Sequence, residues 1–134
     1  MKILWWRILI AAIALEFLYG VFLVFVLGAA EQAFTTLGIV SVFLFMALGG
    51  FWVGSRATSR PILQGGLVGV VAVLFYTVLT TPGVLSGELA VTGPFLLNHL
   101  AKLLGGSFGG LLAGVMSASR KHAVGQEFAS GDQD

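Results

Sequence analysis

Long apolar segments dominate the chain. Four of them reach the roughly 20 residues that a helix needs to cross a hydrocarbon core of about 30 Å. They lie at about residues 8–27, 34–53, 62–80 and 95–116. The second and third contain no charged residue, whereas the first contains Glu16 and the fourth contains Asn98, His99 and Lys102. The pattern predicts an all-α membrane protein, with one four-helix transmembrane domain over residues 1–121.

The composition narrows the class of protein. Hydrophobic residues make up 57% of the 134 residues and charged residues only 10%, against about 25% charged residues in a soluble protein. A soluble domain of this size could not bury so much apolar surface. We therefore expect the lipid bilayer as a partner, no nucleic acid and no soluble enzyme activity. The chain has no cysteine and only two histidines, and we expect neither a metal nor a cofactor.

The positive charges predict the orientation in the membrane. Six of the seven Lys and Arg residues flank the spans on one side, namely Lys2, Arg7, Arg56, Arg60, Arg120 and Lys121. Because such residues accumulate in cytoplasmic loops, we expect a multi-pass membrane protein with both termini in the cytoplasm. The polar segment 122–134 is expected to be a disordered cytoplasmic tail.

The first span could instead be a signal peptide, with small residues at Gly28-Ala29-Ala30 as a cleavage site. Its apolar run of about 20 residues exceeds the 7–15 residues typical of signal peptides. A retained anchor is therefore the preferred interpretation.

A short pattern occurs twice. Residues 49–60 and 109–120 both read G-G-x-x-x-G-x-x-x-x-S-R, offset by 60 positions. The repeat predicts two tandem helical hairpins, about 1–60 and 61–120, which both start on the cytoplasmic side. Independent convergence on small residues is the alternative.

Glycines recur at a spacing of four, which allows membrane helices to approach closely. The fourth span carries two such rows, Gly105-Gly109-Ala113-Ser117 and Gly106-Gly110-Gly114-Ala118, which suggests that it has two neighbours. A crevice lined by backbone is the alternative. The expected helix-packing positions are Gly50, Gly54, Gly65, Gly69, Gly105, Gly106, Gly109, Gly110 and Gly114.

The glycine pattern also supports a resemblance. The stretch Gly49-Gly50-Phe51, the basic Gly54-Ser55-Arg56, and then Gly65, Gly69 and Tyr76 resembles a family of small bacterial four-helix integral membrane proteins to which no function is assigned. The resemblance covers about residues 45–80. It implies a four-helix fold and a location in the bacterial cytoplasmic (inner) membrane, and it implies no activity.

Glu16 is the most informative polar residue. It follows Arg7 by nine positions, or about 13 Å of helix, which places it near the middle of the bilayer. A carboxylate there costs at least about 2.5 kcal/mol, so it must face other helices, be protonated or have a partner. It is either a proton- or cation-coupled site or a packing residue that contacts Tyr76, Thr77 or Thr80.

Lys102 is the candidate partner, but the sequence argues against the pair. It lies about 10 Å inside the outer end of its span, counted from Phe95, and helical side chains lean toward their own N-terminus. The Glu16 and Lys102 side chains should therefore lean apart. We expect Lys102 to extend to the outer interface, where it forms a polar cap with Asn98 and His99. A buried ion pair is the alternative.

These features favour a non-catalytic protein over an enzyme. We expect a scaffold or accessory subunit, assembled through glycine-mediated packing with copies of itself or with another membrane protein. The alternative is a small oligomeric transporter, or a proton or cation pathway, that uses Glu16. The candidate polar site consists of Glu16, Tyr76, Asn98, His99 and Lys102.

Overall fold

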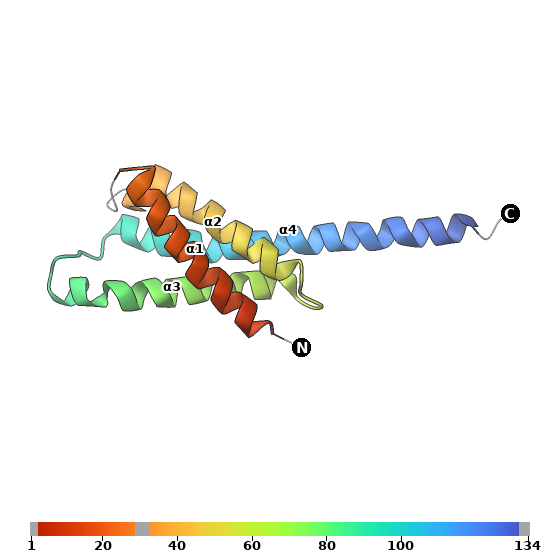
Figure 1. Ribbon diagram of the computed structural model, residues 1–134, viewed down its shortest axis with the longest axis horizontal. Helices are drawn as coiled ribbons and strands as arrows, with labels where there is room; N and C mark the ends of the chain where they lie inside the picture. Colours follow the sequence, from red (N-terminus) through yellow and green to blue (C-terminus); the bar gives the residue numbers. More distant parts are fainter. Residues whose placement is uncertain (1–2, 29–32, 132–134) are drawn as a thin grey trace.

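The chain folds into four helices (Figure 1). The computed structural model describes residues 3–28 and 33–131, and their side chains as far as residue 119. The helices are α1 (Trp5–Phe25), α2 (Thr36–Gly54), α3 (Pro61–Leu85) and α4 (Gly93–Gly131). Each is long and apolar enough to cross a membrane, α4 through its segment Gly93–Ser119. The described residues include no strand, and the prediction of an all-α chain with four candidate spans is confirmed.

The helices α2 and α3 each pack against both α1 and α4. The most extensive contact joins α2 to α4. These two run in the same direction, from the end that holds the C-terminus of α1 to the end from which α4 projects (Figure 1). Since α2 and α4 belong to different halves of the proposed repeat, the division into two hairpins stays a prediction.

Local chemistry explains where α2 and α3 begin. The Thr35 hydroxyl accepts a hydrogen bond from the Gly38 amide at 3.2 Å and so caps α2, since a free N–H at a helix start needs an acceptor. Pro61 is the first residue of α3, as the sequence predicts, because its fixed φ suits a helix start. Arg60 before it adopts a left-handed conformation, with φ of 48°.

The helix α3 continues past the point where the sequence predicts a loop. The expected span ends at Thr80 with Pro82 in the following loop, but Pro82 lies inside α3, which ends at Leu85. Proline removes one backbone donor. Threonine side chains contribute other hydrogen bonds here, and the Thr81 hydroxyl donates to the Thr77 carbonyl at 2.7 Å.

The helix α4 also differs from its expected length. It runs to Gly131, through a segment for which the sequence predicts a disordered tail, and it projects beyond the other helices (Figure 1). The segment 120–131 contains good helix formers such as Arg, Lys, Ala, Gln and Glu, and no proline. Extending an existing helix costs less than nucleating one. Residues 132–134 lie outside the described part.

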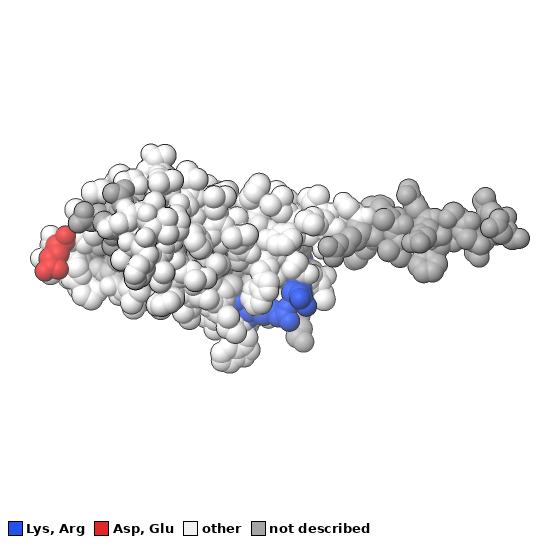
Figure 2. Space-filling model, turned by 45° about the horizontal axis from the view of Figure 1, so that its top comes forward, with Lys and Arg blue, Asp and Glu red and all other residues white. Residues whose placement is uncertain are grey.

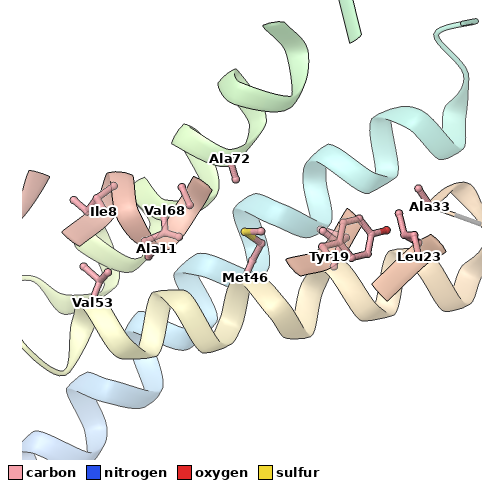
Figure 3. Packing of buried hydrophobic residues seen from close by; sticks show 12 residues of the cluster. Ile8, Ala11, Tyr19, Leu23, Ala33, Met46, Val53, Val68 and Ala72 are labelled. Atoms are coloured by element: carbon pink, nitrogen blue, oxygen red, sulfur yellow. The ribbon is translucent and has the colours of Figure 1, made fainter. Parts of the chain in front are cut away.

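Small side chains fill the space between the helices. Figure 3 shows Ile8 and Ala11 of α1 close to Val68 of α3, with Val53 of α2 nearby. Large apolar side chains point outward instead, and Phe17, Phe25 and Val78 are each more than two-thirds exposed. A surface of this kind suits lipid contact, because soluble proteins rarely expose so large an apolar area to water.

The charged side chains visible on the surface in Figure 2 lie toward opposite ends of the bundle. The described arginines are Arg7 near the start of α1 and Arg56 and Arg60 in the loop before α3. Glu88 is exposed in the loop between α3 and α4, at the opposite end. This charge asymmetry is the basis of the expected orientation.

Candidate intramembrane polar site

Glu16 and Lys102 form a buried ion pair. The Lys102 ammonium lies 2.6 Å from Oε1 of Glu16, and the two side chains are 6% exposed for Glu16 and 0% exposed for Lys102. The expectation that Lys102 extends to the outer interface is therefore wrong. Burial of two opposite charges together costs far less than burial of either one alone.

The helix ends explain the error. Glu16 lies nine residues before Phe25, where α1 ends, and Lys102 lies nine residues after Gly93, where α4 begins. Both residues are therefore about 13 Å from the same end of the bundle. The depths expected from the sequence differ, because each is counted from an estimated boundary at a different end.

An aromatic ring completes the surroundings of the ammonium group. Nζ of Lys102 lies 3.9 Å from the centroid of the Tyr76 ring, a distance at which a cation is attracted to the ring face. Apart from Glu16, no described residue accepts a hydrogen bond from Nζ. The charge is thus held by one carboxylate and one ring.

A second polar contact joins α1 to α4 one helical turn away. The amide nitrogen of Asn98 donates to the Tyr19 hydroxyl at 3.4 Å and to the Ala33 carbonyl at 3.0 Å. Tyr19 donates in turn to the carbonyl of Gly38 in α2 at 3.0 Å. Asn98 is 1% exposed, so these hydrogen bonds replace the water that its amide nitrogen loses on burial. Two side-chain contacts, Glu16–Lys102 and Tyr19–Asn98, therefore connect α1 with α4.

His99 lies beside these two contacts. Its Nδ1 is 2.8 Å from the Phe95 carbonyl one turn earlier in α4. Its ring contacts Tyr76 edge-on, with 5.4 Å between the ring centroids. The structure thus brings all five residues of the predicted polar site together, although Lys102 faces inward and not toward the outer interface.

Sequence reasoning missed two buried polar residues, Tyr19 in this network and Gln64 outside it. Tyr19 was not singled out, although it lies three residues after Glu16 and therefore on the same helical face. Gln64, 1% exposed, accepts from the Leu4 amide at 3.3 Å and donates to the Ser59 carbonyl at 3.2 Å. Its amide in an otherwise apolar segment near the start of α3 was the available signal.

The two small-residue rows of α4 face different helices. A side chain at Gly109 would collide with the Ala47 carbonyl and the Phe51 amide of α2, and one at Gly105 with the Phe43 carbonyl. A side chain at Gly106 or Gly110 would meet the backbone of α3, around Gly65 and Pro61. These glycines allow α4 to approach both neighbours at backbone distance.

The glycines of α2 and α3 complete these close approaches within the chain. A side chain at Gly50 would collide with the Gly106 carbonyl, one at Gly54 would meet Gly110, and one at Gly69 would collide with the Lys102 carbonyl. In contrast, a β-carbon at Gly20 of α1 would meet no atom of a neighbouring helix within 4 Å. The tight packing therefore joins α2, α3 and α4, whereas α1 packs by side chains.

A groove opens between α1 and α3 beside the ion pair. Its volume is about 540 Å³, and Glu16, Gly20 and Tyr76 are among the residues that line it. Most of the other lining residues are apolar, Phe17 and Phe75 among them. The exposed part of the Glu16 side chain is thus next to a space that opens on the outer face of the bundle.

Comparison with known proteins identifies no relative. No family model matches the chain, and neither a curated protein nor a solved structure matches it. Within the described residues, no three His, Asp or Glu side chains gather as a metal site. The function must therefore be inferred from the geometry of the ion pair, the glycine contacts and the groove between α1 and α3.

Proposed function

We propose that the protein is a non-catalytic scaffold or accessory subunit of a bacterial cytoplasmic membrane, with both termini in the cytoplasm. The observation that carries this proposal is the ion pair of Glu16 with Lys102. Glu16, the residue that most suggested transport, is paired with Lys102 and thereby links α1 to α4. The resemblance to small bacterial four-helix membrane proteins agrees with the proposed location.

The glycine contacts support a body of fixed shape. Helices that meet at backbone distance leave little space for alternative packing. Because these contacts lie within the chain, a partner protein must use another surface. The outer face of α1, with Phe17 72% exposed and Trp6 79% exposed, is the surface that we propose for a second copy or another membrane protein.

A cross-linking experiment tests the scaffold proposal. A photoreactive amino acid replaces Phe17 on α1 or, as a matched control, Val78 on α3, which is 71% exposed. Irradiation of native membranes should give a protein adduct of defined mass from position 17 and a weaker one, or none, from position 78. Equal labelling, or lipid adducts alone at both positions, would count against an α1 interface.

A second candidate function is transport of protons or cations through an oligomer. The specific observation in its favour is that Glu16 and Tyr76 line the groove between α1 and α3. A carboxylate that faces such a space can exchange its partner, and an intramembrane acid often marks an ion pathway.

Flux measurements separate the two candidates. Purified protein in liposomes is given a proton gradient, and the flux is compared with that of the double variant Glu16→Gln, Lys102→Met, which contains no charge at this site. Transport predicts a flux that the double variant abolishes while the fold persists. The scaffold proposal predicts the background flux of empty liposomes for both proteins.

A further inference from the structure

A second groove lies between α3 and α4, away from the ion pair. Its volume is about 560 Å³, and it is lined by apolar side chains of α3 from Ile62 to Val70 and by Leu103 and Ser107 of α4. Arg60, immediately before α3, is the charged residue in its lining. The groove is therefore apolar along its length and cationic at one end.

The depth of the groove matches one leaflet of a bilayer. From Arg60 to Val70 the chain rises about 15 Å along α3, which is half of a hydrocarbon core of about 30 Å. Gly66 contributes to the depth, since a β-carbon there would lie 2.9 Å from the Ser107 hydroxyl oxygen. The groove thus runs from the membrane surface toward the middle of the bilayer.

The charge at the mouth of the groove has no counter-charge among the side chains that the structure describes. Arg60 is exposed and forms no ion pair within the described residues. Arg56 lies in the same loop, and positive charge gathers at this end of the bundle (Figure 2). Of the described acids, Glu88 lies at the other end and Glu16 is paired with Lys102. The site therefore favours an anion.

We propose that this groove binds a glycerophospholipid with an anionic headgroup. The occupant must be soluble in the membrane because the groove opens on its apolar face, and it must have a negative group at one end to complement Arg60. The guanidinium would bind the lipid phosphate through paired hydrogen bonds. One acyl chain would lie along Ile62 to Val70, over the length of a single leaflet.

Native mass spectrometry with phosphatidylglycerol and phosphatidylcholine tests this site. Arg60→Gln should lower the occupancy of phosphatidylglycerol about fivefold, the factor expected for one cation near an anionic lipid, and should leave phosphatidylcholine nearly unchanged. Arg7→Gln is the matched control, because Arg7 lies at the same end of the bundle and outside the groove lining. Equal losses in the two variants would show diffuse attraction to the surface and overturn the site.

The acyl-chain part of the proposal has its own variants. Gly66→Leu and Val70→Trp place bulk in the groove and should each lower the binding of both lipids. Gly20→Leu, which fills the groove on the opposite side of α3, serves as the control. Val70 is 39% exposed, so its substitution tests the groove even if Gly66→Leu disturbs packing against Ser107. Unchanged lipid binding in a folded Val70→Trp protein would overturn the proposal.

Discussion

Removing one partner of the Glu16–Lys102 pair should destabilise the bundle, and removing both should restore much of the loss. Glu16→Gln leaves the Lys102 ammonium in a site where its side chain is 0% exposed. Lys102→Met leaves a carboxylate that still borders the groove between α1 and α3. In each single variant the remaining charge has lost its counter-charge.

The expected loss of stability depends on whether the unpaired group stays charged in the membrane or becomes neutral by proton transfer. An unpaired charge in the middle of the membrane costs about 2.5–3.5 kcal/mol on the insertion scale. Escape by proton transfer at pH 7 costs about 5 kcal/mol for an ordinary lysine and about 4 kcal/mol for an ordinary carboxyl group. The cheaper route sets the loss, so we expect about 3 kcal/mol for Glu16→Gln. The loss for Lys102→Met should be smaller, because Glu16 has the groove beside it.

The free energy of unfolding in mixed detergent micelles measures these losses. The double variant Glu16→Gln, Lys102→Met should be more stable than Glu16→Gln alone, with an interaction free energy of about 2–3 kcal/mol. Glu88→Gln removes an exposed carboxylate from a loop and should change the stability by less than about 0.5 kcal/mol. If the loss in the double variant equals the sum of the losses in the two single variants, the ion pair is refuted and Lys102 must be in contact with water.

Three further predictions concern packing, orientation and hydrogen bonding. Gly109→Leu should cost about 3 kcal/mol or more, because its side chain meets the backbone of α2, whereas Gly20→Leu should cost little in the same unfolding assay. Cysteine at Thr58 should resist a membrane-impermeant thiol reagent in intact cells while cysteine at Glu88 reacts, and the reverse pattern would overturn the proposed orientation. Asn98→Leu should cost about 1–2 kcal/mol by thermal denaturation, since the hydrogen bonds to Tyr19 and Ala33 are lost.

The helices were predictable because a bilayer sets their minimum length. Any apolar run of about 20 residues meets this requirement, and the observed α1 and α2 agree with the expected spans to within about three residues. The start of α3 followed from Pro61. The continuation of α3 past Pro82 did not, because the surroundings of a proline in the folded protein decide whether a membrane helix continues past it.

The composition of the polar site was predictable, but the partners were not. Glu16, Asn98 and Lys102 stand out in apolar segments, because burial of such groups requires partners. Their pairing depends on helix boundaries, and an error of two or three residues at each end changes a depth by about 4 Å. Tyr19 was missed because tyrosine is common near membrane surfaces, and its buried hydroxyl depends on the position of Asn98.

The helix α1 packs differently from the other three helices, and this difference connects the ion pair with the two proposed functions. Backbone-distance glycine contacts connect α2, α3 and α4, whereas α1 reaches α4 through the Glu16–Lys102 and Tyr19–Asn98 contacts. Local opening begins where packing is least dense, so the loss in Glu16→Gln should appear first as faster hydrogen exchange in α1. A scaffold would keep α1 in place, whereas a transporter would move it so that Glu16, which lines the groove, exchanges Lys102 for a transported ion. The ion pair therefore holds α1, the helix whose movement would distinguish a transporter from a scaffold.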